Sequence, residues 1–401
     1  MVEYHEFLSL SRSSDSETRG QAAHLSAVAY LAHKGPADEH AALYAALIGF
    51  LEDPSVKVRA ALAYGLLHSS DAPRPIILAL LQDSAVIARA VAQYSPVLLD
   101  ADLIGRVKFF EISMLVAVSQ RSKVSTRLAS ALVARNDSQL TKRLLERADI
   151  VFETEVLNAL CQAHRGDADM RGALLARKDL PASARLQLVE SAVAALRGAR
   201  LVKGALAPER LDRLLRDTVD TAITAIGERE AHRSAPGYVS DLIDADQVSA
   251  RVLLHAVVHG HVMFFADCLA MLAQAPRDKV FSLLETGSRA SLNALLARCG
   301  LGEAVRNLVS RLVFYARASD LADDASARHY VVTALTEEMI AEFDGEIPTE
   351  LEDAFSYLSD QNILLARKAA KGVMAAFASE ASSPLAIPAP VAGELMVLPA
   401  A

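Results

Sequence analysis

Histidine and cysteine side chains that could ligate a metal gather in one short stretch of this sequence, at His255, His259, His261 and Cys268. His255 and His259 share one face of a predicted helix and could present two imidazole nitrogens to Zn²⁺. Gly260 is expected to end that helix, so His261 begins the next one and Cys268 lies nearly two turns further along. The pattern therefore favours histidines at a hairpin turn, on the surface or packed, and we predict no metal and no cofactor.

Motifs of the common nucleotide-binding and hydrolytic enzymes do not occur in the sequence. It contains no Gly-x-x-x-x-Gly-Lys phosphate loop, no Gly-x-Gly-x-x-Gly turn and no Gly-x-Ser-x-Gly elbow. Adjacent carboxylates such as Glu337-Glu338 and Glu352-Asp353 point about 100° apart on a helix, so they cannot share a substrate. We expect a solvated acidic face there, no catalytic residues, and a protein that is not an enzyme.

Two Asp/Arg pairs are the sharpest polar pattern in the chain. Residues 51–60 recur as residues 81–90, and the pairs Asp53/Arg59 and Asp83/Arg89 belong to this repeat. Each aspartate can cap the following helix, and the pairs can form a ladder of charge-assisted hydrogen bonds between successive turns. We favour this structural role. The alternative is that the arginines face a groove and bind an acidic partner, which requires solvent exposure.

The elements that position these residues are helices. The repeat, which Tyr64 and Tyr94 extend, has a spacing typical of stacked helical hairpins, and no alternation of apolar and polar residues predicts a strand. Apolar residues at helical spacing predict helices at 21–34, 38–51, 55–68, 74–82, 85–94, 102–118, 123–135, 138–147, 153–164, 168–177, 182–198 and 208–231. Further helices are predicted at 253–258, 262–273, 279–285, 289–298 and 303–317.

The predicted fold is all-α: a right-handed α-solenoid of HEAT-like helical hairpins, in one stack or in two halves, with a disordered C-terminal tail. Residues 234–237, Ser-Ala-Pro-Gly, form the strongest interior break. We therefore expect four parts: an N-terminal segment (1–20), a HEAT-like repeat domain (21–233), a second helical domain that continues the stack (238–378), and a Pro/Ala-rich flexible tail (379–401).

Charge is unevenly distributed along the chain. The net charge is -8, but residues 106–147 carry nine basic and three acidic side chains, whereas residues 320–360 carry twelve acidic and one basic. Partner-binding candidates in the basic stretch are Arg121, Arg127, Arg135 and Arg143. Nucleic-acid binding is an unlikely use of them, because the chain has no Trp and this stretch offers only two aromatic residues for stacking on bases.

Location follows from the apolar runs and the cysteines. No apolar run approaches the ~20 residues of a bilayer-spanning helix, and the acidic N-terminal residues do not match a secretory signal. The three cysteines, Cys161, Cys268 and Cys299, are far apart and set among apolar residues, which predicts reduced, buried thiols. We expect a cytoplasmic protein that does not bind a membrane.

The ordered motifs of the chain resemble a known family. The block Leu-x-Asp-Pro-x-x-x-Val-Arg at 51–59 looks like a HEAT-type repeat, and the motif order is similar to that of the alphaproteobacterial domain of unknown function family 2336. The motifs are Ala72-Pro73, 83–89, Ser95-Pro96-Val97-Leu98, Asp102-Leu103-Ile104, 118–121, Val124-Ser125 and 175–181, with weaker similarity at 255–272 and 299–301. This resemblance implies an α-helical repeat protein with no catalytic residues to transfer.

The function we predict is a non-catalytic scaffold or adaptor, regulatory in role, that binds an unidentified protein partner on its concave helical surface. One alternative is a nucleic-acid-binding solenoid that uses residues 106–147. A second is an enzyme or small-ligand protein with its site between the two halves near residues 234–247. A third is a homo-oligomer held by the opposite charges of 106–147 and 320–360. The apolar residues 395–398 could dock in a groove of this chain or of a partner.

Overall fold

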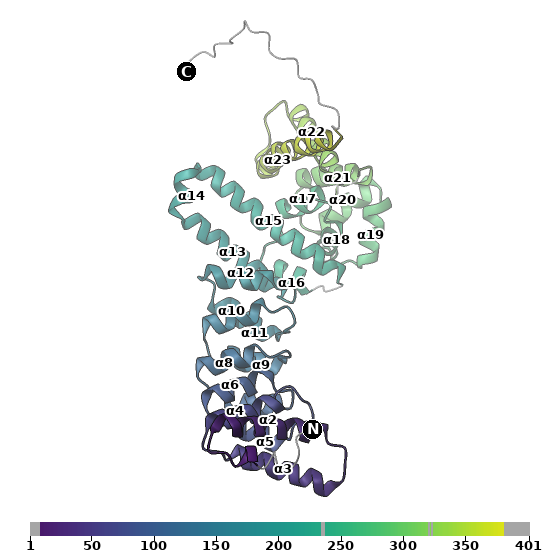
Figure 1. Cartoon of the computed structure of the whole chain (residues 1–401). Coiled ribbons are helices and arrows are strands. Elements are labelled where there is room, and N and C mark those ends of the chain that lie inside the picture. Colours follow the sequence, from purple (N-terminus) through teal and green to yellow (C-terminus); the bar gives the residue numbers. More distant parts are fainter. Residues whose placement is uncertain (1–8, 234–236, 320, 322–323, 381–401) are drawn as a thin grey trace. The chain divides into compact units, whose positions relative to one another are not determined.

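The computed structural model describes residues 9–233, 237–319, 321 and 324–380 (Figure 1). Within these ranges all regular secondary structure is helical and no strand occurs, so the predicted all-α class is confirmed. The chain divides into two compact units, Met1–Ala195 (unit 1) and Leu196–Ala401 (unit 2).

Unit 1 consists of short helices in two rows. In one row each even-numbered helix contacts the next even-numbered helix, from α2 to α12. In the other row α3 contacts α5, and α7 contacts α9 (Figure 1). The helices are α2 (Ser16–Ala32), α3 (Ala37–Leu51), α4 (Val56–Leu66), α5 (Arg74–Leu80), α6 (Ala85–Tyr94), α7 (Asp100–Val107), α8 (Ile112–Ser119), α9 (Thr126–Val133), α10 (Ser138–Glu146), α11 (Thr154–Ala163), α12 (Ala168–Ala176) and α13 (Ala182–Gly198). One apolar core runs between the rows from Ala22 to Leu188.

Small residues let α2 and α4 approach closely at the start of the row. A Cβ added at Gly65 would lie 2.6 Å from the Cβ of Ala27, well inside van der Waals contact. A Cβ added at Gly20 would lie 3.6 Å from the Cβ of Ala61, across the same contact. Because these positions carry little or no side-chain bulk, the backbones of the two helices can pack tightly.

Two predicted boundaries in unit 1 are wrong. The single helix expected at 102–118 is two helices, α7 and α8, because the chain turns after Val107. At this turn the guanidinium of Arg135 donates hydrogen bonds to the carbonyls of Lys108 and Phe110. The N-terminal segment was expected to reach residue 20, but α2 begins at Ser16, where the Asp15 carboxylate accepts a hydrogen bond from the Thr18 amide at 3.0 Å. Asp15 is thus the helix cap that sets this boundary.

Unit 2 is built around a long helix, α15, which packs against α16, α17 and α18. Its helices are α14 (Arg200–Ala205), α15 (Pro208–His232), α16 (Gly237–Asp244), α17 (Ala250–Val258), α18 (Val262–Leu272), α19 (Arg277–Thr286), α20 (Arg289–Arg298), α21 (Glu303–Arg317), α22 (Ala325–Glu342) and α23 (Thr349–Glu380). The contact of α15 with α18 is close: a Cβ added at Gly227 would lie 2.1 Å from a ring carbon of Phe264.

The division between the units differs from the boundary expected at 234–237. Residues 234–236 lie outside the described residues, and the helices on either side of them, α15 and α16, both belong to unit 2 because they pack on α18. The helix α23 continues to Glu380 and so includes the first two residues of the expected tail. The rest of that predicted tail, residues 381–401, lies outside the described residues.

Candidate functional site

The aspartates of the repeat form two ion pairs with arginines, and these pairs link successive turns. The Arg59 guanidinium pairs with Asp83, Nε to Oδ2 at 2.7 Å and Nη2 to Oδ1 at 2.9 Å, and it donates to the backbone carbonyl of Asp53 at 2.7 Å. The Asp53 carboxylate pairs in turn with Arg19. These hydrogen bonds hold the pKa values of both carboxylates below their usual range. Arg89 does not continue the series, since it donates only to Ala85 in its own helix.

The four arginines proposed to bind a partner do not act as one group. Arg121 donates to the carbonyls of Ala92 at 2.5 Å and Ser95 at 3.0 Å, and burial lowers its pKa. Arg135 is likewise engaged at the end of α7, as described above. Only Arg127 and Arg143 are exposed. Two of the four candidates are therefore bound to backbone carbonyls, and the other two are exposed on the surface.

A general device explains Arg121 and Arg135. The last carbonyls of a helix have no partner within that helix, and here a guanidinium from the next pair of helices supplies the donors. Arg177 is the strongest case: it donates to Leu145 at 3.0 Å, to Arg147 at 3.1 Å and to Ile150 at 2.6 Å, with 5 % of its side chain exposed. The same arrangement recurs at Arg147, Arg298 and Arg317.

Sequence reasoning missed this role for the basic residues. Each such arginine lies 23–34 residues after the carbonyls that it binds, a separation close to the repeat length. The periodic recurrence of arginine was therefore the available signal. Three of the nine basic residues of 106–147, Arg121, Arg135 and Arg147, join successive helices in this way.

Two exposed tyrosines of unit 1 lie on its even-numbered helices. Tyr64 of α4 is 69 % exposed and Tyr94 of α6 is 50 % exposed. The ring of Tyr64 lies 5.6 Å from that of His24 on α2, and the ring of Tyr94 lies 5.4 Å from that of His68, just after α4. These two ring pairs lie on α2, α4, the turn after α4, and α6, and we call them together the tyrosine face.

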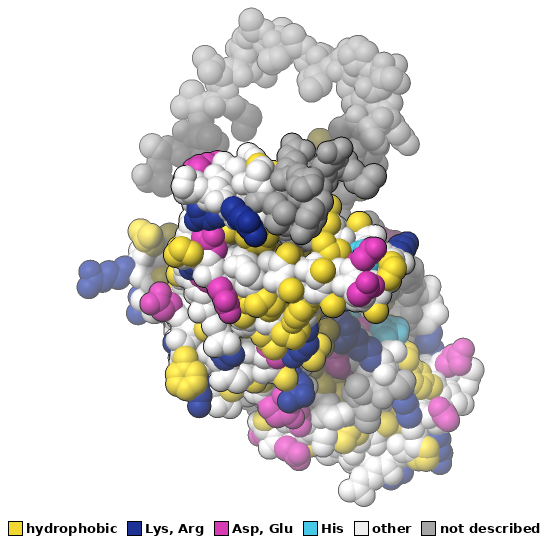
Figure 2. Space-filling view, turned by 60° about the horizontal axis from the view of Figure 1, so that its bottom comes forward, with side chains coloured by type: hydrophobic (Ala, Val, Ile, Leu, Met, Phe, Trp, Pro, Cys, Tyr) yellow, Lys and Arg dark blue, Asp and Glu magenta, His cyan; other side chains and the backbone are white. Residues whose placement is uncertain are grey.

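An open groove borders the tyrosine face. It has a volume of about 690 Å³ and shares His24 with the face; its other lining residues are Ser16, Glu17, Gly20, Gln21, Leu25, Lys57, Ala60 and Ala61. Lys57 and Glu17 face each other across it at 3.6 Å, and both are well exposed. With the N-terminal end turned toward the reader, Figure 2 shows hydrophobic side chains lying among acidic and basic ones. The aromatic side chains beside this groove are of the type that is enriched in protein interfaces.

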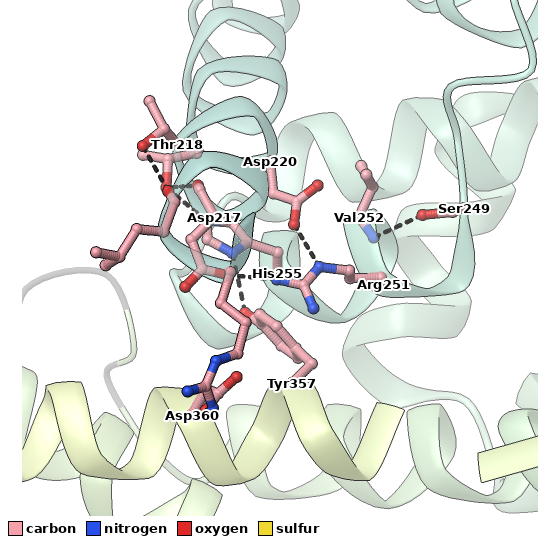
Figure 3. Close-up of polar contacts among 12 residues, drawn as sticks. Asp217, Thr218, Asp220, Ser249, Arg251, Val252, His255, Tyr357 and Asp360 are labelled. Atoms are coloured by element: carbon pink, nitrogen blue, oxygen red, sulfur yellow. Dashed lines mark hydrogen bonds and ion pairs between the residues drawn. The ribbon is translucent and has the colours of Figure 1, made fainter. Parts of the chain in front are cut away.

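The histidines of unit 2 belong to a buried polar network. His255 is 1 % exposed and stacks on His259, with ring centroids 4.0 Å apart. Its Nδ1 lies 3.0 Å from the hydroxyl of Tyr357 and its Nε2 lies 3.3 Å from that of Thr221 (Figure 3). Burial lowers the pKa of His255 to about 2 and that of His259 to about 4, so both rings are neutral at pH 7.

Charged residues complete this network. Arg251 pairs with Asp217 and with Asp220, the latter at 2.6 Å, and its guanidinium lies 4.8 Å from the centre of the Tyr357 ring. Burial raises the pKa of both aspartates, while Arg251 opposes that rise. In Figure 3, Tyr357 extends from α23 toward His255 on α17. The network thus fastens three helices, α15, α17 and α23, to one another.

The histidines and the cysteine that were considered as possible metal ligands are not grouped as a metal site in the described part of the structure. Cys268 is fully buried, and burial raises the pKa of its thiol. Burial also raises the pKa of Cys161 and that of Cys299, each to about 11. Among the residues that the structure describes, no three His, Cys, Asp or Glu side chains are placed to hold a metal ion. In the segment expected to border a cleft, residues 234–247, the side chains of Tyr238 and Leu242 are buried.

A family model for uncharacterised proteins conserved in bacteria, DUF2336, matches residues 87–349, about two thirds of the chain. The chain belongs to this family. No curated protein and no solved structure matches the chain. In the part of the chain that is described, none of the helices is both long and apolar enough to span a bilayer.

The DUF2336 match covers some of the features above and leaves others outside. Within it lie Tyr94, the helix-capping Arg121 and Arg177, and the network residues of α15 and α17. The repeat block at 51–59 and Tyr64 precede it, and Tyr357 follows it. The predicted resemblance to this family is confirmed, although the matched range begins later and ends later than the motifs indicated.

Proposed function

We propose that this protein is a non-catalytic scaffold or adaptor with a regulatory role, and that it binds a protein partner through the even-numbered helices of unit 1. In this proposal the two rows of helices are a right-handed α-solenoid of HEAT-like hairpins, and the protein acts in the cytoplasm of an alphaproteobacterium. The partner-binding helices are those that line the concave side of such a stack.

The single observation that carries the proposal is the tyrosine face. Tyrosines dominate the energetics of many protein interfaces because they bury a large rigid area at a low entropic cost. Two tyrosines that are at least half exposed, each beside a histidine ring, leave their remaining apolar area in water. The core does not need these side chains, because the apolar contacts between the rows are made by other, buried residues. A binding surface accounts for their position.

The rival functions have less support. Nucleic-acid binding was proposed on Arg121, Arg127, Arg135 and Arg143, and two of these donate to backbone carbonyls rather than facing solvent. Arg127 and Arg143 remain exposed together with Lys108 and Lys123, which is a small footprint for binding phosphates. The buried histidines are neutral and enclosed by Tyr357 and Thr221, which supports a structural role for them rather than a reacting one.

The experiment is a quantitative affinity purification from the native cell. It compares the wild type with the double variant Tyr64→Ala/Tyr94→Ala and with the control Tyr330→Ala, which removes a tyrosine of unit 2 that is 66 % exposed. We expect one stoichiometric protein partner that the double variant loses and the control retains. Equal recovery of that partner by all three proteins, or no stoichiometric partner of the wild type, would contradict the proposal.

A further inference from the structure

A second groove lies in unit 2, between the first half of α15 and the middle of α23. Its volume is about 260 Å³, and its lining residues are Arg210, Arg213, Leu214, Asp217, Asp360, Ile363, Leu364 and Arg367. Three apolar side chains remain in water there: Leu214 is 39 % exposed, Ile363 is 56 % exposed and Leu364 is 41 % exposed. The groove therefore offers an apolar floor for aliphatic side chains.

The charges around this floor favour an acidic occupant. Arg213 pairs with Asp360 at 2.9 Å, and Asp217 is taken by Arg251. Arg210 and Arg367 are exposed and have no ion-pair partner among the described residues. The groove thus presents two available guanidinium groups on either side of apolar side chains, and its two carboxylates are already neutralised.

Buried contacts of Tyr357 fix the helices that form the walls of the groove. Tyr357, one turn before Asp360 on α23, is fully buried and binds His255 of α17, and it lies under the guanidinium of Arg251. These contacts fix α23 against α15 and α17. A groove with rigid walls requires little ordering when a segment binds, so a short peptide can gain affinity there.

We propose that the occupant is a segment of the same chain, Glu394-Leu395-Met396-Val397-Leu398, which lies outside the described residues. Its composition matches the groove: one carboxylate for Arg210 or Arg367, followed by four apolar side chains for the floor. This inference concerns unit 2 and is independent of the proposed function of unit 1.

The length of the chain permits this contact. From Leu364 to Glu380 the helix α23 rises about 24 Å, at ~1.5 Å per residue. Residues 381–394 span up to ~46 Å when extended, at ~3.3 Å per residue. The segment can therefore return along the helix to the groove of its own chain without strain.

Because the chain has no Trp, the variant Leu398→Trp places a unique fluorophore in the proposed occupant of the full-length protein. Its emission and acrylamide quenching are compared with those of a free peptide of residues 391–400 carrying the same change. Docking shields the indole, so we expect a blue-shifted emission and a quenching constant at least about threefold below that of the peptide. Values equal to those of the peptide overturn the proposal.

Two further variants, each added to Leu398→Trp, test whether the protection of the indole from quenching depends on the groove. Arg210→Glu/Arg367→Glu should return the quenching constant to the peptide value, whereas Met374→Ser, which changes a 70 % exposed apolar residue of α23 away from the groove, should not. Arg210, Arg367 and Met374 are exposed, so we expect these variants to fold, and circular dichroism checks this. Unchanged quenching in the charge-reversed protein overturns the proposal, and so does protection that appears only as protein concentration rises, since that identifies a second copy as the occupant.

Discussion

Replacing Arg177 with Met tests how the helical layers of unit 1 are joined. Arg177 donates to three backbone carbonyls and pairs with Asp179, and its guanidinium lies 4.6 Å from the centre of the Phe152 ring. Methionine preserves apolar volume but supplies no donor. The carbonyls of Leu145 and Ile150 then lose their partner, and the carboxylate loses its cation.

The magnitude follows from these losses. Removing one partner of a buried charged pair costs about 3–5 kcal/mol, and part of this is recovered here because Asp179 is 31 % exposed. We therefore expect Arg177→Met to lower the free energy of unfolding of unit 1 by about 3 kcal/mol. For a unit of this length that corresponds to a decrease in Tm of about 6–12 °C.

The assay is thermal and urea unfolding followed by circular dichroism, with hydrogen exchange to localise the effect. Amides after the end of α10 should exchange faster in Arg177→Met. The matched control is Arg143→Met, an exposed arginine of α10 whose loss should cost less than about 0.5 kcal/mol. If both variants unfold at the same temperature, the arginine caps do not stabilise the stack and the reasoning is refuted.

Two further predictions concern the network in unit 2. His255 and His259 have folded-state pKa values of about 2 and about 4, below the unfolded value of about 6.5, so the unfolded chain binds protons first and stability falls as pH decreases. Between pH 7 and pH 5 the loss is about 2 kcal/mol for each histidine, and His259→Gln should remove about half of it; equal pH slopes in urea unfolding would contradict this. Arg251→Met leaves Asp217 and Asp220 buried without a cation and should cost about 3–5 kcal/mol at pH 7. That penalty should shrink toward pH 5, because the carboxylates with raised pKa values become neutral; a penalty that grows on acidification would argue against the assignment.

The helices of this chain were largely predictable because their apolar spacing is a local property. The helices at 85–94 and 182–198 have the predicted bounds, since one sequence window contains the whole apolar stripe. The break inside 102–118 was not predictable in this way. It depends on Arg135, which binds carbonyls 25–27 residues earlier in the chain.

The candidate functional residues were harder to predict, because their roles depend on neighbours that are distant in sequence. His255 had local signals for a metal ligand, yet its partner Tyr357 is 102 residues away. Arg121 and Arg127 have the same side chain and similar local sequence, and only the packing of the preceding layer distinguishes the buried cap from the surface cation. Tyr64 and Tyr94 were visible as a repeat, but their exposure required the structure.

Site-specific photo-crosslinking in the native cell tests the central claim most directly. A photoreactive phenylalanine analogue replaces Tyr64, Tyr94 or, as the control, Tyr330, and crosslinked products are identified by mass spectrometry. The account predicts that positions 64 and 94 crosslink to the same single protein and that position 330 does not. Crosslinking of that protein equally from position 330, or none from positions 64 and 94, would contradict the claim that the even-numbered helices of unit 1 bind a protein partner.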